Sequence, residues 1–260
     1  MKLLSINCHA WQEENQINKI KKLAEFIKNN QYDVIAMQEV SQHKDSEIKY
    51  DNIRVDNYVE MLNSELKLLG EESYNFVWDF SHMGYDVYEE GLAILTKHPI
   101  NSYRSFYVSK DKTITNYKSR KIIEANINVN GKNINFYSCH LGWWEDKDEP
   151  FKDQADELLK NIDSDLSFVM GDFNNNAFVR SEGYDYLINK GLFDTYALSE
   201  IKDNGVTVPG EIDGWEACSE QKRLDLILCN NEICVKISNV VLNRSEYVIS
   251  DHFGVEIVLE

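Results

Sequence analysis

The sequence predicts an α/β fold in one domain, and three observations support this. Short apolar runs typical of buried strands alternate along the chain with segments whose apolar residues recur at helical spacing. Apolar residues make up 43% of the 260 residues, and there are only three prolines, as in folded globular proteins. No internal repeat, low-complexity tract or linker-like stretch divides the chain. We therefore expect residues 1–260 to form a single domain with a sizeable core.

Two apolar strands near the N-terminus run into polar residues. The first, Leu3–Cys8, closes on Asn7 and His9. The second, Asp33–Met37, leads almost directly into Glu39. A Glu in this position is either the exposed end of a strand or a placed ligand, and the local sequence favours neither interpretation.

Four segments have the apolar spacing of amphipathic helices. Gly70 and Gly191 follow two of them, and Gly is common just after the C-terminus of a helix. The helix that ends before Gly70 is expected to pack on a sheet. The four segments are residues 17–28, 55–69, 155–160 and 184–190.

Asn130-Gly131 is the clearest hairpin signal in the chain, because this dipeptide between apolar strands favours a two-residue turn. Such a turn pairs Ile127 with Ile134. Continued along the strands, the same register sets Lys121 opposite His140. That face otherwise carries core residues, so a Lys and a His at its end predict a site at the rim of the sheet.

Two loops are expected to lie at the surface. Tyr74–Phe80 and Gly91–Thr96 are predicted strands joined by a long polar loop, a common place for substrate contacts. A second loop, residues 141–151, holds Trp143 and Trp144 among acidic residues. These tryptophans either cap the core or stack on a sugar ring.

Three strands in the second half of the chain carry acids at or near their ends. Asp172 and Asn174 follow an apolar run and a Gly, and they point the same way if the backbone stays extended. By itself, this Gly-Asp-Asn pattern is also typical of a turn. Asp225 lies inside an apolar strand, where a carboxylate is costly unless it is hydrogen-bonded or charge-paired. Asp251 and His252 open the last strand.

The formal net charge of −17 disfavours nucleic acid and anionic membranes as partners, although an acidic surface also serves solubility. The five cysteines show no metal-ligand spacing. Cys8, Cys139 and Cys229 lie in or beside apolar strands, so we expect small core residues in a reducing compartment. The first residues do not resemble a signal peptide, and no apolar run has the length of a membrane span. These features predict a cytoplasmic protein.

Polar residues that a core does not explain lie at strand ends along the whole chain, and strands of one core would bring them into one pocket. Carboxylate and amide oxygens suit Mg²⁺ or Mn²⁺, whereas zinc is disfavoured because no His or Cys residues cluster. The chain has neither a nucleophile elbow nor a Gly-rich phosphate loop. The residues are Asn7, Glu39, His140, Asp172, Asn174, Asp225, Asp251 and His252.

These strand ends resemble the motifs of the endonuclease/exonuclease/phosphatase superfamily of metal-dependent phosphoesterases. They occur in the order of the family and span the chain. The resemblance implies a four-layered α/β sandwich, in which two packed mixed or antiparallel β-sheets are flanked by helices. The motifs are Ser5-Ile6-Asn7, Met37-Gln38-Glu39, Ser138-Cys139-His140-Leu141, Gly171-Asp172-Phe173-Asn174, Arg223-Leu224-Asp225 and Ser250-Asp251-His252.

The resemblance also implies which residues bind metal and move the proton. Glu39 is the expected main ligand of Mg²⁺, or of Mn²⁺ in its place, with Asn7 and Asp251 in or beside the metal shell. His252 is the expected general base, or it orients the attacking water, and Asp225 holds its tautomer.

Other residues are implied to bind the phosphate. Asp172 and Asn174 position the nucleophile and the scissile phosphate, and His140 binds a phosphoryl oxygen. A basic residue completes the site: the hairpin register favours Lys121, and the resemblance equally allows Arg120. Many members of the family carry Asn or Asp where this chain has His9, so the second metal position stays open.

The stretch His140–Trp144, with Glu149–Phe151, is similar to the bacterial maltose 6′-phosphate phosphatases. This similarity implies that water attacks the phosphorus of a small sugar phosphate in line, with Trp143 or Trp144 against the sugar. One alternative is a nuclease or a sphingomyelinase-like phosphodiesterase on the same fold, and another is a binding module without catalysis. The charge of −17 opposes a nuclease, and the filled catalytic positions oppose a binding module. No protein partner is inferred.

Overall fold

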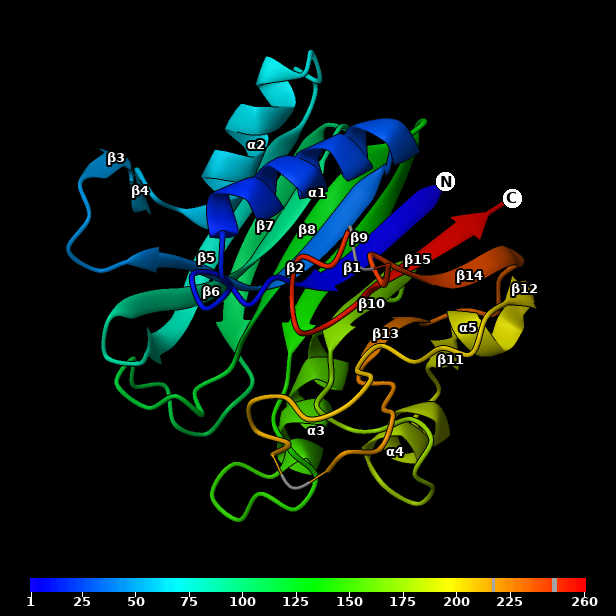
Figure 1. The fold of residues 1–260 in the computed structure, drawn as a ribbon. Coiled ribbons are helices and arrows are strands. Elements are labelled where there is room, and N and C mark those ends of the chain that lie inside the picture. The colour runs from blue at the N-terminus through cyan, green and yellow to red at the C-terminus, as the bar shows by residue number, and fades with distance from the viewer. Residues whose placement is uncertain (217, 245–246) are drawn as a thin grey trace.

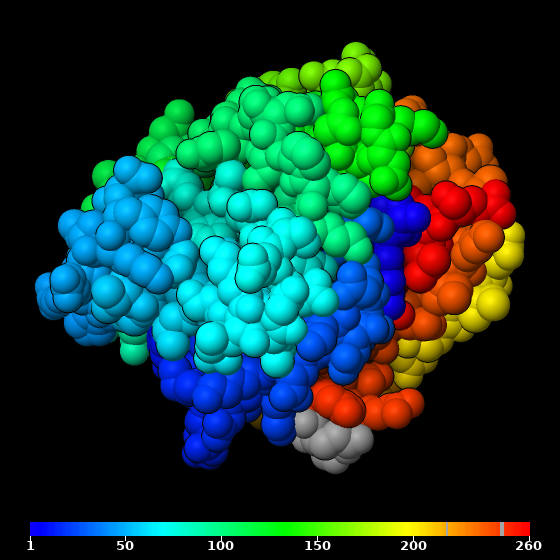
Figure 2. Space-filling view, turned by 90° about the horizontal axis from the view of Figure 1, so that it is seen from above, coloured from blue at the N-terminus to red at the C-terminus, as the bar shows by residue number. Residues whose placement is uncertain are grey.

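Two β-sheets packed face to face form the centre of the protein in the computed structural model, which confirms the predicted α/β fold. The structure describes residues 1–216, 218–244 and 247–260. A third, two-stranded sheet of β3 (Ile48–Tyr50) and β4 (Ile53–Arg54) lies in a segment that projects from the body of the molecule (Figure 2).

The first sheet contains seven strands. In spatial order they are β12 (Ser199–Lys202), β14 (Val235–Val241), β15 (Gly254–Leu259), β1 (Lys2–Asn7), β2 (Val34–His43), β6 (Tyr88–Thr96) and β5 (Asn75–Gly84). β1 and β2 are parallel, whereas β15 is antiparallel to β1. The C-terminal ends of β1 and β2 and the beginning of β15 therefore meet at one edge of the sheet.

The second sheet contains six strands. In spatial order they are β11 (Phe193–Asp194), β13 (Asp225–Cys229), β10 (Ser167–Asp172), β9 (Lys132–His140), β8 (Lys121–Val129) and β7 (Ile100–Tyr107). β9 and β10 are parallel, and β13 is antiparallel to β10. The ends of β9 and β10 thus lie beside the beginning of β13.

Helices cover the outer face of each sheet, which completes the four layers. Figure 1 shows α1 (Gln16–Asn30) and α2 (Tyr58–Leu68) on one side of the strands, and α3 (Phe151–Asn161) and α4 (Gly183–Asn189) on the other. A short helix, α5 (Thr195–Leu198), follows β11. The two termini lie close together, since Leu259 N–H donates to the Met1 carbonyl oxygen over 2.9 Å.

Three buried apolar clusters fill the spaces between these layers. The cluster between the sheets includes Phe136 and Phe168, whose stacked ring centroids are 5.5 Å apart. A second cluster packs α1 and α2 on the first sheet, and it includes Leu23 and Leu62. A third includes Leu158 and packs α3 and α4 on the second sheet. Because both faces of each sheet are covered, the strand ends are held in fixed relative positions.

The predicted hairpin and the predicted core cysteines are confirmed. Asn130 and Gly131 have φ angles of 53° and 85°, the left-handed values of a two-residue hairpin turn. Ile127 pairs with Ile134 as expected. The three cysteines expected in the core are buried, and all five cysteines are free. No helix in the described part of the chain is both long and apolar enough to span a membrane.

Two predicted boundaries differ from the structure. Val55 is 48% exposed and precedes α2, which begins at Tyr58 because the Asn57 side chain accepts a hydrogen bond from Glu60 N–H. The long loop expected before Gly91 is largely strand, since β5 continues to Gly84 and β6 begins at Tyr88. Its polar residues pair across a hairpin, so their polarity does not indicate a loop.

The strands β3, β4, β7, β11, β12 and β14 were not predicted. They are short or lie at or near the edges of the sheets. In β7, for example, Asn101–Ser105 are exposed. Such strands lack the apolar runs on which the prediction rested.

Candidate active site

Strand ends of both sheets bring the predicted polar residues to one place. Asn7 ends β1, His140 ends β9 and Asp172 ends β10, while Asp225 begins β13 and His252 precedes β15. Parallel neighbours end at the same edge, and antiparallel neighbours begin there. Of the eight residues expected to share one pocket, Asn7 and Asp225 do not line the cavity at this edge, and the other six do.

A cavity of about 530 Å³ opens at this edge. Its inner part is formed by buried and half-buried residues at or near strand ends, together with Arg120, His82 and Glu90. Among the described residues that line the whole cavity, seven are Asp or Glu and only Arg120 is a Lys or Arg. The outer part is formed by Met83, Gly84, Tyr85, Asp86, Thr115, Tyr117, Trp143, Ile212, Asp213, Gly214 and Glu216.

Glu39 lies at an irregularity of β2, where the register with β6 shifts between Met37 and Val40. Its φ angle is 50°, a left-handed value that is uncommon for a non-Gly residue and typical of functional sites. Asn7 Nδ2 donates to Glu39 Oε1 over 2.8 Å. Burial, together with the charges of Glu90 and Asp251, raises the pKa of Glu39 to about 8.

The donor atoms here fit a hard divalent cation. Glu39 and Asp251 offer carboxylate oxygens, the ligands that Mg²⁺ and Mn²⁺ prefer. Asn7 instead directs its amide nitrogen at Glu39 and Asp172, because its Oδ1 accepts a hydrogen bond from His9 N–H. The ligand atoms of Glu39, His140 and Asp172 lie within 4.8 Å of one another. A cation would offset the negative charge of these carboxylates, which adds to the effect of burial in raising the pKa of Glu39.

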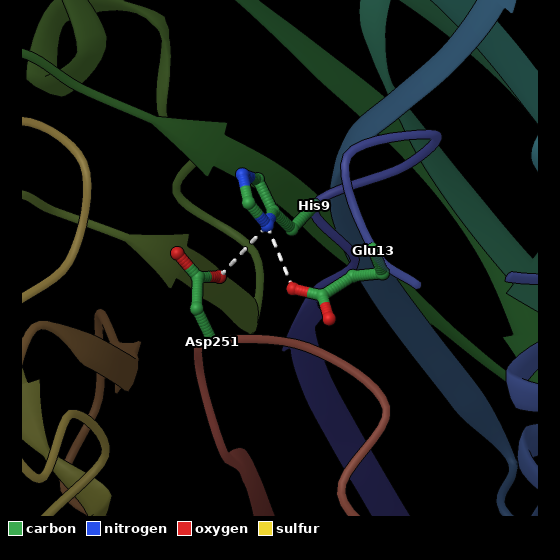
Figure 3. A group of neighbouring side chains, drawn as sticks. All are labelled: His9, Glu13 and Asp251. Carbon is green, nitrogen blue, oxygen red and sulfur yellow. Dashed lines mark hydrogen bonds and ion pairs between the residues drawn. The ribbon is translucent and has the colours of Figure 1, made fainter. Parts of the chain in front are cut away.

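His9 lies between two carboxylates at the edge of the cavity (Figure 3). Its Nδ1 is 2.8 Å from Glu13 Oε1 and 3.6 Å from Asp251 Oδ1. Burial lowers the pKa of His9, but these two carboxylates and that of Glu39 raise it more, to about 9. The three side chains can therefore hold either a proton on His9 or a cation between them.

His252 and Asp225 form a buried pair. His252 Nδ1 lies 2.9 Å from Asp225 Oδ2, and Asp225 is fully buried. Burial lowers the pKa of His252, but the charges of Asp225 and Asp172 raise it well above its usual value. Because Nδ1 is held by Asp225, Nε2 faces Asp172, whose Oδ2 is 3.7 Å away. Burial also raises the pKa of Asp172 to about 6.

Hydrogen-bond donors converge on His140. Its Nδ1 lies 3.3 Å from Arg120 Nη1, and its Nε2 lies 3.1 Å from Asn174 Nδ2. Burial and the charge of Arg120 hold the pKa of His140 well below its usual value, so the ring is neutral and accepts at one nitrogen only. Arg120 Nε has no hydrogen-bond partner in the described part of the chain. These groups therefore hold more donors than the single acceptor nitrogen of His140 can satisfy.

Asn174 reaches this position by a route other than the expected extended strand. Its φ angle is 48°, and its N–H donates to Asp172 Oδ1 over 2.8 Å. The two side chains therefore meet through a tight turn. The turn and the site, which were alternative interpretations of this motif, occur together.

The two basic residues considered for phosphate binding, Arg120 and Lys121, lie in different surroundings. Arg120 lines the cavity, whereas Lys121 does not: its Nζ lies 2.7 Å from Asp79 Oδ2. Lys121 begins β8, and its side chain is held by a carboxylate of the facing sheet. Arg120 directly precedes the strand, and its buried side chain extends to His140.

The two tryptophans also differ, because only one of them lines the cavity. Trp143 lines the cavity, and its ring centroid lies 5.9 Å from the Arg120 guanidinium carbon. Trp144 packs instead against Phe151 and Tyr186, with ring centroids 6.1 and 6.0 Å away. Trp144 therefore belongs to the packing of α3 and α4, and it does not line the cavity.

Several residues at the cavity were not predicted from the sequence. His82 Nε2 lies 3.3 Å from Glu90 Oε1, and both residues line the inner part. Glu90 directly precedes an apolar run, so the signal that drew attention to Glu39 was present here too. Asp213, which also lines the cavity, and Trp215, which donates to Asn174 Oδ1, lie in a polar segment without periodicity, which offered no comparable signal.

Comparisons with known proteins agree with this geometry. The model of the Endonuclease/Exonuclease/phosphatase family matches residues 14–252. An endonuclease/exonuclease/phosphatase family protein from Leptotrichia buccalis is 40% identical, with a TM-score of 0.93 over 100% of this chain and 99% of that chain. No curated protein matched the sequence.

Two more distant structures share the fold. A mannosyl-6-phosphatase from Bacteroides thetaiotaomicron is 17% identical, with a TM-score of 0.73 over 100% of this chain and 99% of that one. The beta toxin of Staphylococcus aureus, determined with bound magnesium ions, is 18% identical. Its TM-score is 0.68, again over 100% of this chain and 99% of that one.

Proposed function

The chain belongs to the endonuclease/exonuclease/phosphatase family, whose members are metal-dependent hydrolases of phosphoesters, and we propose that it is a Mg²⁺-dependent phosphatase of a small sugar phosphate. The best candidate is a disaccharide phosphate such as maltose 6′-phosphate. Mn²⁺ is the alternative cation.

One observation carries this proposal: a group of unsatisfied donors lies beside a group of uncompensated acids. Arg120 Nε has no hydrogen-bond partner among the described residues, and the neutral His140 can accept from only one of the two N–H groups, of Arg120 and Asn174, that face it. Glu39 and Asp172 lie 3.9 and 3.8 Å from His140 Nε2. A phosphoryl group supplies acceptors to the first group, and a divalent cation supplies charge to the second. Few ligands other than a metal-bound phosphate satisfy both.

The proposed main metal ligand is Glu39, with Asn7 and Asp251 in or beside the metal shell. A divalent cation held by them would neutralise phosphate charge as it develops in the reaction. Arg120 binds a phosphoryl oxygen, and the neutral His140 donates a hydrogen bond to another. In-line attack on phosphorus needs such positioning and charge stabilisation more than covalent chemistry.

The attacking water is positioned by Asp172 and His252. Their facing atoms, Oδ2 and Nε2, are 3.7 Å apart, and a water between them would have a partner on each side. The proton of the water passes to Asp172 and His252, which titrate as a coupled pair. Asp225 keeps His252 Nε2 directed at the water, and Asn174 holds the scissile phosphate.

The outer part of the cavity supports a small, neutral leaving group. Asp86, Asp213 and Glu216 line it, and with the net charge of −17 they repel a polyanion such as DNA. Carboxylates accept hydrogen bonds from sugar hydroxyls, and the Trp143 ring offers a face for stacking. The name of the mannosyl-6-phosphatase shows that this fold can serve a sugar phosphate in another protein.

A substrate panel tests the proposal. Purified enzyme with Mg²⁺ is given maltose 6′-phosphate, glucose 6-phosphate, supercoiled plasmid and sphingomyelin vesicles, and release of phosphate or nicking is measured. We expect phosphate release from the sugar phosphates and little cleavage of plasmid or lipid. Efficient plasmid nicking at physiological salt, without phosphate release from the sugar phosphates, would establish the nuclease instead.

A further inference from the structure

A loop over the cavity is closed at its neck by a short β-bridge. Val208 and Lys222 pair through backbone hydrogen bonds of 2.9 and 3.1 Å, Lys222 N–H to the Val208 carbonyl and Val208 N–H to the Lys222 carbonyl. We call the described residues between them, 209–216 and 218–221, the cover loop. Several of its residues line the outer part of the cavity.

The Lys222 ammonium fills the inside of this loop. The side chain is fully buried, and its Nζ donates to the carbonyl oxygens of Gly210, Cys218 and Glu220 over 2.7, 2.6 and 3.0 Å. An ammonium has three donors, so these three acceptors satisfy it fully. Burial of a charge is costly without such bonds. The loop and its lysine therefore stabilise each other.

Three contacts tie the tip of the cover loop to the rest of the site. Tyr85 Oη donates to Asp213 Oδ2 over 2.7 Å, which joins the hairpin between β5 and β6 to the loop. Gly214 packs against Trp143 so closely that a Cβ atom at Gly214 would lie 2.8 Å from the Trp143 ring. Trp215 Nε1 donates to Asn174 Oδ1 over 3.1 Å.

The contact of Trp215 fixes the orientation of the Asn174 amide. An indole N–H can only donate, so the oxygen of Asn174 must face Trp215. The Leu141 carbonyl can only accept, and it lies 3.0 Å from Asn174 Nδ2. Two partners of fixed polarity thus direct the amide nitrogen toward His140, where the phosphate is proposed to bind.

We propose that the cover loop is the specificity element for the group attached to the phosphate, and that Lys222 and Trp215 are positioning residues. Lys222 holds the loop in the shape that contacts the sugar. Trp215 couples the loop to the phosphate site by fixing Asn174. This proposal rests on the proposed phosphatase function, because the loop is assigned to the leaving group of that reaction.

Two variants test the proposal separately. Lys222→Met keeps an unbranched apolar chain but removes all three donors, and Trp215→Phe keeps a ring but removes the indole N–H. With Lys222→Met, we expect KM for glucose 6-phosphate to rise about tenfold, while p-nitrophenyl phosphate, which lacks the sugar, changes less than about threefold. With Trp215→Phe, we expect kcat to fall about tenfold for both substrates, equal to about 1.4 kcal/mol.

A measurement that needs no substrate tests this proposal independently of the proposed function. The indole N–H signals of ¹⁵N-labelled protein report hydrogen exchange, and the signal absent from Trp215→Phe identifies Trp215. In Lys222→Met, exchange at Trp215 should be at least about tenfold faster, because the loop opens more often. Lys236→Met, at an exposed lysine, is the control and should change neither exchange nor kinetics.

Each outcome bears on one proposal. If the wild-type enzyme cleaves no sugar phosphate, the proposed function fails, and the exchange measurement still decides whether Lys222 holds Trp215. Unchanged Trp215 exchange and unchanged kinetics in Lys222→Met would overturn the role of Lys222. If Lys222→Met does not fold, Trp215→Phe decides alone: wild-type kcat on both substrates would overturn the coupling to Asn174.

Discussion

The inner and outer parts of the cavity are built differently. The inner part consists mainly of side chains at strand ends, such as Asp172 and His252, which are 1% and 3% exposed. The outer part consists largely of loop and turn residues, such as Tyr85, which is 59% exposed. Two packed sheets hold the first set in place, whereas a few hydrogen bonds hold the second. We infer that the inner part sets the reaction and the outer part sets the substrate.

This difference leads to distinct expectations for mutations. Changes in the inner part should reduce kcat for every substrate, since they act on the phosphoryl group itself. Changes in residues that line the outer part should act mainly on KM, and only for substrates that carry the sugar, whereas Trp215 acts on kcat through Asn174. The predictions below run from the largest expected effect to the smallest.

Glu39→Gln should have the largest effect, because it removes the carboxylate proposed to bind the cation. Turnover should fall by about a thousandfold or more, since the cation contributes several kcal/mol of charge stabilisation. Phosphate release gives the rate, and calorimetric titration with Mg²⁺ should show weaker binding while circular dichroism stays unchanged. Glu72→Gln, at an exposed position, is the matched control. Full activity of Glu39→Gln, or of wild type in excess EDTA, would contradict the assignment.

His252→Ala and Asp225→Asn should each reduce kcat at least about a hundredfold, the usual scale for positioned proton transfer. The double variant should be little slower than His252→Ala, because the 2.9 Å contact makes the two residues act as one unit. Steady-state kinetics of the three variants on one substrate measure this. Additive losses would mean that Asp225 has a function other than orienting His252.

Trp143→Ala and Trp144→Ala compare the cavity directly with the packing beside it. Trp143→Ala should raise KM for a sugar phosphate about tenfold, since one stacked aromatic contributes about 1 kcal/mol or more, and should affect an aryl phosphate less. Trp144→Ala should lower Tm, because it leaves a space beside Phe151 and Tyr186, with little change in KM. Equal changes of KM in both variants would place the sugar elsewhere.

The smallest expected effect is on stability as a function of pH. Without a cation, the pKa of Glu39 is raised from 4.5 to about 8. A raised pKa contributes stability that is present below pH 4.5 and is lost as the pH rises toward 8. Mg²⁺ should restore this loss, so the difference in Tm between Mg²⁺ and EDTA should grow by several degrees over that range. In Glu39→Gln the difference should be smaller and nearly independent of pH. A difference that is the same at both ends of the range would argue against Glu39 as a ligand.

Much of the inner part could be predicted from sequence, although not His82 and Glu90, because most of its residues interrupt strong strand signals. A carboxylate inside an apolar run, such as Asp225, needs a partner, and the structure supplies His252. Gly171 is required where it stands, since a Cβ there would lie 1.9 Å from the Cys139 carbonyl oxygen. The motif around Asp172 therefore combines a close packing requirement with a chemical one.

The outer part could not be predicted, because loop geometry depends on contacts between segments that are far apart in the sequence. Tyr85 and Asp213 are 128 positions apart, yet their side chains are hydrogen-bonded. Lys222 resembles an ordinary charged residue next to Arg223, and nothing in the sequence indicates that its ammonium fills a loop. The choice between Arg120 and Lys121 also needed the structure, since it depended on Asp79 of another sheet.

The most direct test of the central claim compares two esters that release the same aryl leaving group. The kcat/KM values for p-nitrophenyl phosphate and bis-p-nitrophenyl phosphate are measured with Mg²⁺ and wild-type enzyme. If donors at Arg120, His140 and Asn174 surround a terminal phosphoryl group, the monoester should be preferred about a hundredfold or more, since the diester leaves buried donors unpaired. Equal or faster cleavage of the diester would contradict the account and identify a phosphodiesterase.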